Sequence, residues 1–497
     1  MPAITRYLLR FGIYSLALGV IAIAFLVSAA RMLLPLADQY QDEIENLLGE
    51  SLGYPVQIES LSAKWRGVYP SVALKNVVIR DPDRHDSSWI SLQEMEVWFN
   101  PYQYWLNKKI LVNKYKVTGT TLNIEKNPDG SLRLNGRNLS PESELSLSFI
   151  REMLSSISAI DLEEINFSYT GAGDNPSHVN IHAERLELHQ QTSHIRVAGV
   201  LHRPEDENGY ASFIGLLPDE ASTFEGANVK FHLKVDTELK DWLTPWLPGG
   251  MSIKQGYSYI QIWGNTRGPI LQDIDVQLAV TDLVWQRTLV STGEPLLPGK
   301  LKGFSTHARW QRTHQGWTLV ADPLLVATPT KTWESGKLVL VHQDASEGKQ
   351  QSLAGRLNFL NLDDLTAWSS TLLENFSLRE KFNELDLKGG VGSIVFSMQG
   401  PVFSPQQYTV NANVKGLDFR SIDGLPGISG VDGFVQFTES DGEIMLDSTG
   451  FHMSFPVLFR QDLYAETMSG VVHWHHDDEM WQLGSNDIRL SNQDIEI

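Results

Sequence analysis

The chain has 497 residues, a formal net charge of −20 at pH 7 and no cysteine. With 42% hydrophobic residues it is too apolar for a disordered chain, and its length allows several domains or one elongated structure. The acidic balance excludes nucleic acid as a partner, because phosphate binding needs clustered Lys and Arg, and the lack of cysteine excludes structural disulfides, thiol catalysis and cysteinyl zinc sites.

The N-terminal segment predicts a membrane anchor. A charge-free run from Phe11 to Ala30 lies between Arg10 and Arg31. Its length is what a bilayer requires, about 20 residues at ~1.5 Å rise each. The residues expected to face the lipid are Phe11, Ile13, Leu16, Leu18, Val20, Ile21, Ile23, Phe25, Leu26 and Val27.

The charges that flank this run predict its orientation. Arg6 and Arg10 favour a cytoplasmic N-terminus (residues 1–10), a single span over 11–31 and a body outside the cytoplasm. A large cysteine-free body is ordinary for a bacterial envelope protein, so we expect the inner membrane, with the body in the periplasm. A signal peptide cleaved near Ala29 is the alternative.

An amphipathic helix is predicted next, over residues 34–53. Apolar residues recur there at three- and four-residue spacing until Gly53 and Pro55 interrupt the pattern. Because its polar face is acidic, we expect the helix to cap the first sheet rather than to lie on anionic lipid.

From Val56 onward the period changes to two, which is typical of strands. The sequence predicts a mainly β body with a few short helices. An Asn-Pro-Asp-Gly turn at 127–130 predicts a hairpin. The short helices are expected around 143–157, 239–247 and 362–373.

An internal repeat divides the second half. Gly268–Ile270 followed by Val276–Val280 matches Gly400–Val402 followed by Val410–Val414. Repeated one-faced units cannot bury their apolar faces alone. We expect an N-terminal β region over 56–230, one repeat unit over 231–361 and a second over 362–497. The strand-like spacing up to Ile497 indicates that this second unit continues beyond the chain's end.

The alternating strands supply the candidate functional face. Apolar side chains occupy every second position in several strands, with polar residues between them. The candidates are Val229, Phe231, Leu233, Val235, Val276, Leu278, Val280, Ile394, Phe396, Met398, Val410, Ala412 and Val414. Alternation alone does not distinguish an open trough from the core of a β-sandwich.

Evidence for chemistry at a site is weak. His473, His475 and His476 with the adjacent acidic run 477–479 resemble metal ligands, but the absence of a remote fourth ligand favours a solvated strand end. No serine-hydrolase elbow, P-loop, dinucleotide fingerprint or zinc-protease motif occurs, so we expect no enzyme, metal or cofactor. Adjacent carboxylates such as Glu163 and Glu164 point to opposite faces of a strand.

Several motifs follow one another in an order that resembles the AsmA-like family of Gram-negative bacteria, in particular its YhdP-type branch. They are Leu33-Leu34-Pro35, Leu52-Gly53-Tyr54-Pro55-Val56, Ser62-Ala63-Lys64-Trp65, Leu425-Pro426-Gly427-Ile428 and Ser469-Gly470-Val471-Val472-His473-Trp474. The resemblance implies an elongated, twisted and bent antiparallel β-sheet trough (β-taco). It also implies movement of phospholipid from the inner to the outer membrane along the hydrophobic groove of that trough.

Two functions remain open on this basis. The first is a bridge whose partners are phospholipids and the inner membrane, and which supports the outer-membrane permeability barrier. The alternative is an envelope scaffold that offers strands to outer-membrane components during their assembly. In both cases outer-membrane or periplasmic proteins are possible partners and nucleic acid is not.

Overall fold

The computed structural model divides the chain into two compact units, Met1–Val229 (unit 1) and Lys230–Ile497 (unit 2). Each unit is mainly β. The residues that the structure describes are 41–52, 54–66, 69–81, 84–99, 112–127, 131–138, 158–171, 178–191, 193–203, 206–218, 227–240, 247, 250–268, 270–289, 293–346, 349–365, 368, 383–401, 405–422, 426–457, 460–477 and 480–492.

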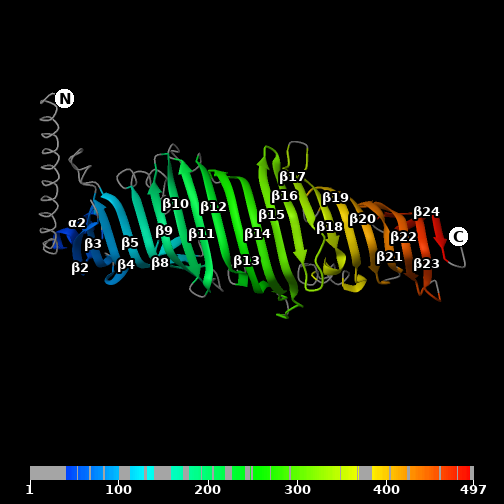
Figure 1. Cartoon of the computed structure of the whole chain (residues 1–497), viewed down its shortest axis with the longest axis horizontal. Helices are drawn as coiled ribbons and strands as arrows, with labels where there is room; N and C mark the ends of the chain where they lie inside the picture. The colour runs from blue at the N-terminus through cyan, green and yellow to red at the C-terminus, as the bar shows by residue number, and fades with distance from the viewer. Residues whose placement is uncertain are drawn as a thin grey trace, which may run out of the picture. The chain divides into compact units, whose positions relative to one another are not determined.

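The described part of unit 1 begins with helix α2 and continues as strands (Figure 1). Its elements are α2 (Gln41–Leu52), β1 (Val56–Gln57), β2 (Ser60–Arg66), β3 (Tyr69–Asp81), β4 (Arg84–Phe99), β5 (Val112–Lys126), β6 (Leu132–Leu134), β7 (Arg137–Asn138), β8 (Ala159–Thr170), β9 (His178–Gln190), β10 (His194–Arg203) and β11 (Asp206–Pro218).

Helix α2 packs on the first strands of unit 1. Its Ile44 lies against a buried cluster that includes Leu61 and Leu74. The Glu45 side chain accepts a hydrogen bond from the Ile58 backbone N–H at 2.7 Å, which satisfies a strand-edge donor that no strand pairs. The helix lies within the predicted range 34–53, whose other residues lie outside the described part.

The expected hairpin after β5 is present, because Ile124 pairs with Leu134 across an antiparallel ladder. The expectation of purely antiparallel pairing is wrong at one place. Strand β8 pairs with β5 in parallel, with Val117 opposite Leu162. Ala159, the first residue of β8, pairs with Lys114 near the start of β5, so the two strands run in the same direction.

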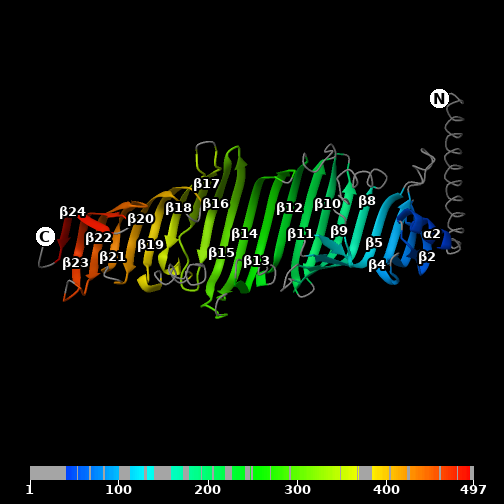
Figure 2. The same cartoon turned by 180° about the vertical axis from the view of Figure 1, so that it is seen from behind.

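Unit 2 is built from long strands that follow the chain order (Figure 2). Strand β12 (Asn228–Glu238) crosses the border between the units. The strands that follow are β13 (Met251–Arg267), β14 (Ile270–Arg287), β15 (Gly299–Thr313), β16 (Gly316–Ala327), β17 (Gly336–Gln343), β18 (Ser352–Asn361), β19 (Lys388–Gln399), β20 (Gln407–Phe419), β21 (Gly427–Thr438), β22 (Asp441–Ser454), β23 (Leu463–His476) and β24 (Trp481–Ser491).

Each strand from β13 to β24 pairs antiparallel with the next. The connections alternate between two edges of this sheet. Most connections at one edge, the turn edge, are short: they follow β13, β15, β17, β19, β21 and β23. Longer connections leave the opposite edge, the loop edge, after β14, β16, β18, β20 and β22. Residues 362–365 in one of them are helical, within the helix expected over 362–373.

A row of residues with positive φ interrupts the alternation near the loop edge. In unit 2 it includes Asp282 (50°), Gly416 (58°), Gly430 (71°) and Gly450 (70°). Asp282, Gly416 and Gly430 each lie in a four-residue pattern such as Val414-Lys415-Gly416-Leu417, in which two residues instead of one separate two apolar ones. We call this row the bulge line, since such residues bend strands and reset which side chains share a face.

The bend brings apolar residues from both sides of the bulge line into one buried cluster. On β22, Leu446 precedes Gly450 and Phe451 follows it, and both belong to this cluster with Val431 and Ala465. The cluster therefore lies on the inside of the bend, where burial of side chains from β20 to β24 stabilises it.

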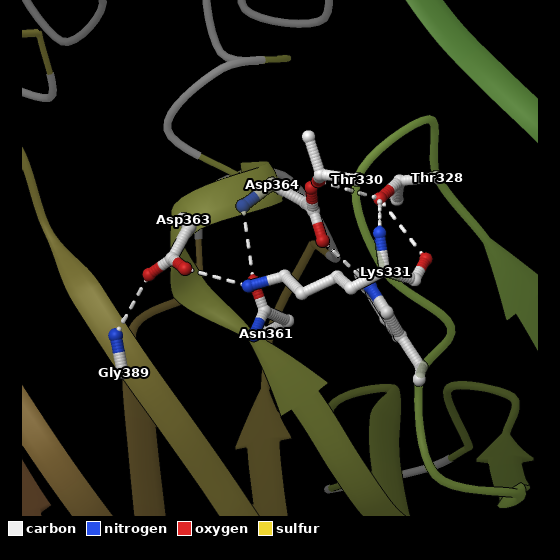
Figure 3. A network of polar contacts seen from close by, with 8 residues as sticks. Thr328, Thr330, Lys331, Asn361, Asp363, Asp364 and Gly389 are labelled. Atoms are coloured by element: carbon white, nitrogen blue, oxygen red, sulfur yellow. Dashed lines mark hydrogen bonds and ion pairs between the residues drawn. The ribbon is translucent and has the colours of Figure 1, made fainter.

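Polar contacts hold the loop edge together between β16 and β19 (Figure 3). Lys331 Nζ lies 2.6 Å from Asp363 Oδ2, and Asp363 Oδ1 accepts the Gly389 backbone N–H at 2.9 Å. Burial alone would raise the pKa of Asp363, but these hydrogen bonds and the lysine charges outweigh burial and hold the pKa below its ordinary value. Trp333 Nε1 donates a hydrogen bond to Asp364 Oδ2 at 2.7 Å. Asp363 and Asp364 therefore connect their own loop to the β16–β17 loop and to β19.

Candidate functional site

Strand register places the candidates of unit 2 on one face of its sheet. Directly paired residues on neighbouring strands point to the same side, so a face can be followed from pair to pair. One such path runs Val276, Ala308, Ala321, Leu338, Leu357, Ile394. A second runs Met398–Tyr408 and Phe396–Val410–Phe437–Gly442–Trp474–Leu483.

Alternation within each strand adds the remaining candidates to the same side. Leu278 and Val280 lie with Val276 on β14, and Ala412 and Val414 lie with Val410 on β20. We call this side of β13 to β24 the apolar face. All the candidates on β14, β19 and β20 belong to it.

The β12 candidates extend the same pattern. The ring of Phe231 lies over Gly264, where a methyl group would come within 2.5 Å of its Cζ. Gly264 pairs with Ile274 on the apolar face, so Phe231 lies on that side. Val229, Leu233 and Val235 share its side of β12 by alternation, and the intervening His232 stacks on Trp263 of the opposite face.

The apolar face is only partly covered. Val280, Ala412 and Val414, near the bulge line, are at most 8% exposed. The candidates farther toward the turn edge, among them Phe396 and Met398, are half-buried. Residues between two packed sheets would be buried along the whole strand, so this gradient is unlike a sandwich core.

The opposite face is the more polar of the two, although Trp263, Val341 and Val395 also lie on it. Its Asp275 accepts hydrogen bonds from His307 Nε2 at 2.6 Å and from Arg309 at 3.0 and 3.2 Å. Burial alone would raise the pKa of Asp275, but these hydrogen bonds and charges hold it below its ordinary value. The two faces of unit 2 therefore differ in polarity, as expected if one face contacts water and the other an apolar ligand.

The sequence did not identify the middle of the apolar face. In β17 the run Leu338-Val339-Leu340-Val341 is apolar on both sides of the strand. A period of two therefore does not indicate which of these residues lie on the apolar face. Only the ladder partners show that Leu338 and Leu340 belong to the apolar face while Val339 and Val341 point away.

The predicted anchor residues, from Phe11 to Val27, lie outside the described residues. Within the described ranges, no helix combines the length and the hydropathy of a membrane span.

The histidine cluster has local partners. His475 Nδ1 lies 2.7 Å from Asp441 Oδ1, and the His473 ring lies over Gly484. In the part of the chain that the structure describes, no group of three His, Cys, Asp or Glu side chains has the arrangement of a metal site. Asp478 and Glu479 lie outside that part.

Comparison with known proteins gives two results. A family model described as "YhdP protein" matches residues 1–497. The chain is also similar to the "Intermembrane phospholipid transporter YhdP" of Escherichia coli (strain K12), with 21% identity over 494 residues. That match covers 95% of this chain and 36% of the relative, so the chain spans about a third of the relative's length.

Proposed function

Because the chain belongs to the YhdP family, we propose that it carries phospholipids between the inner and outer membranes of a Gram-negative envelope. The apolar face would hold the acyl chains during passage, and residues 11–31 would anchor the chain in the inner membrane with its body in the periplasm. Such transport would support the outer-membrane permeability barrier and needs no catalytic residue.

The continuity of the apolar face is the observation that supports this proposal most. Each CH₂ group moved into water costs about 0.8 kcal/mol, so a lipid with about thirty of them does not leave a membrane unaided. The two paths of cross-strand pairs, one from Val276 to Ile394 and one from Phe396 to Leu483, would give acyl chains an apolar surface that continues from strand to strand. Most of these side chains are half-buried, and Leu483 is exposed, which leaves surface for that contact.

Two neighbouring residues of β19 test the proposal. Phe396 lies on the apolar face, whereas Val395 lies on the opposite face and is 37% exposed. A carboxylate among acyl chains costs about 2.5–3.5 kcal/mol, equivalent to a factor of about 100 in local occupancy. We expect Phe396→Asp to slow transfer of a fluorescent phospholipid from vesicles carrying the full chain to acceptor vesicles at least tenfold, and Val395→Asp to leave it nearly unchanged.

Circular dichroism and thermal unfolding would establish that both variants are folded. If folded Phe396→Asp transfers lipid as fast as the unchanged chain, the apolar face is not the route and the proposed function fails.

A further inference from the structure

The turn edge of the apolar face carries a row of aromatic side chains. We propose that this row holds the glycerol and headgroup region of each phospholipid, whose acyl chains point toward the bulge line; this rests on the proposed function. The row consists of Trp310, Trp317, His342, Tyr408, Phe437 and Trp474, and we call it the aromatic row.

Register places the row on the apolar face beside the turns. Trp310 pairs with Ile274, Trp317 with His342, and Tyr408 with Met398. Phe437 and Trp474 both pair with Gly442, which follows the short turn between β21 and β22. Each of these residues lies within about four residues of the strand end at the turn edge, and Arg312 and His476 follow Trp310 and Trp474 on the same side of their strands.

Two pairs of rings in the row touch across neighbouring strands. Trp317 and His342 stack with centroids 5.2 Å apart and an interplanar angle of 8°. Tyr408 and Phe437 meet edge to face at 6.3 Å. The indole of Trp474 fills the space over Gly442, which is the direct partner of Phe437.

Four residues of the row have a polar atom that is available to a ligand, whereas Nδ1 of His342 is buried. Among the described residues, the indole N–H groups of Trp310, Trp317 and Trp474 and the Tyr408 hydroxyl make no hydrogen bond, and none of them is sealed from solvent. Trp333, at the loop edge, instead donates its N–H to Asp364. Rings with an apolar body and an accessible donor suit the boundary between acyl chains and ester or phosphate oxygens.

The distance from the row to the bulge line fits an acyl chain. Tyr408 and Val414 are six residues apart on β20, which is about 20 Å at ~3.3 Å per residue. Half of a ~30 Å hydrocarbon core is about 15 Å. Between these two residues the apolar face of β20 presents only Val410 and Ala412, so this span offers chains no polar group.

The absence of cysteine allows a direct test with single-cysteine variants of the full chain. Phe437→Cys places a fluorophore in the aromatic row, and Leu417→Cys places it beside the bulge line. Exposed Gln436→Cys and Lys415→Cys are the matched controls on the opposite side of the same strands. Each purified variant is loaded with phospholipid carrying a nitroxide either on the headgroup or near the end of an acyl chain.

We expect the headgroup nitroxide to quench the Phe437→Cys label at least twofold more than the chain-end nitroxide, and the reverse order at Leu417→Cys. Equal or reversed quenching at these two positions would overturn the proposed lipid orientation while leaving the proposed function standing. Quenching no stronger at either position than at the two controls would show that lipid does not occupy the apolar face, and the proposed function would fail.

Discussion

At the scale of single residues, the buried carboxylate of Asp161 makes unit 1 sensitive to acid. Asp161 is 1% exposed, forms an ion pair with Lys114 and lies 2.8 Å from His189 Nε2. Burial alone would raise its pKa, but the hydrogen bonds and charges of these two partners lower it below the ordinary value. A carboxylate with a lowered folded-state pKa stabilises the fold above its unfolded pKa, and this contribution disappears as pH falls through the folded pKa.

We therefore expect Asp161→Asn to lower the free energy of unfolding by about 1–3 kcal/mol at pH 7, because the amide carries no charge and offers Lys114 and His189 one acceptor oxygen instead of two. The stability of the variant should also decrease less below pH 4 than that of the unchanged chain. Urea denaturation at pH 7 and pH 3.5 measures both effects. Asp275→Asn is the control, since its partners are exposed and such pairs contribute about 0–1 kcal/mol. Equal acid sensitivity of Asp161→Asn and the unchanged chain would contradict this account.

At the scale of strands, the bulge line predicts which glycines tolerate a side chain. Gly430 and Gly416 both have positive φ, but a methyl group on Gly430 would lie 2.6 Å from the Gly450 carbonyl oxygen, whereas one on Gly416 meets nothing within 4 Å. Gly416→Ala should cost only the backbone strain of about 1–2 kcal/mol. Gly430→Ala should cost clearly more, because the neighbouring strand must also move. Thermal unfolding of the two variants compares these costs, and equal melting temperatures would refute a close packing of β21 on β22.

The strands also show what the sequence could predict. Alternation predicted that Val276, Leu278 and Val280 share one side of their strand, and that Val410, Ala412 and Val414 share one side of theirs. The ladders place both sets on the same face of the sheet. Alternation could not connect them, because β17 is apolar on both sides. The phase change at Gly416 was missed too, although an apolar, polar, glycine, apolar sequence marks it and recurs at Gly430. The parallel β5–β8 pair was missed because pairing of distant strands leaves no mark in a local pattern.

At the scale of the whole molecule, function would depend on continuity rather than on any single site. A two-stranded hairpin contributes a few half-buried apolar side chains, too few to shield an acyl chain from water. Shielding along a path requires that successive hairpins keep their apolar side chains on one face, and the ladder partners from β14 to β24 do so despite local register shifts. One charged residue introduced between the aromatic row and the bulge line would then interrupt the whole route.

The same continuity predicts how much lipid the chain holds. An apolar face that is open along many strands should retain several phospholipids, whereas a scaffold that acts by strand pairing needs none. We expect mass spectrometry of the full chain, extracted in detergent and washed thoroughly, to detect more than one phospholipid per chain. Val395→Asp, altered on the opposite face, should retain the same number, and Phe396→Asp fewer. A folded chain free of lipid would favour the assembly scaffold, because an open apolar face with no bound lipid has no role in transport.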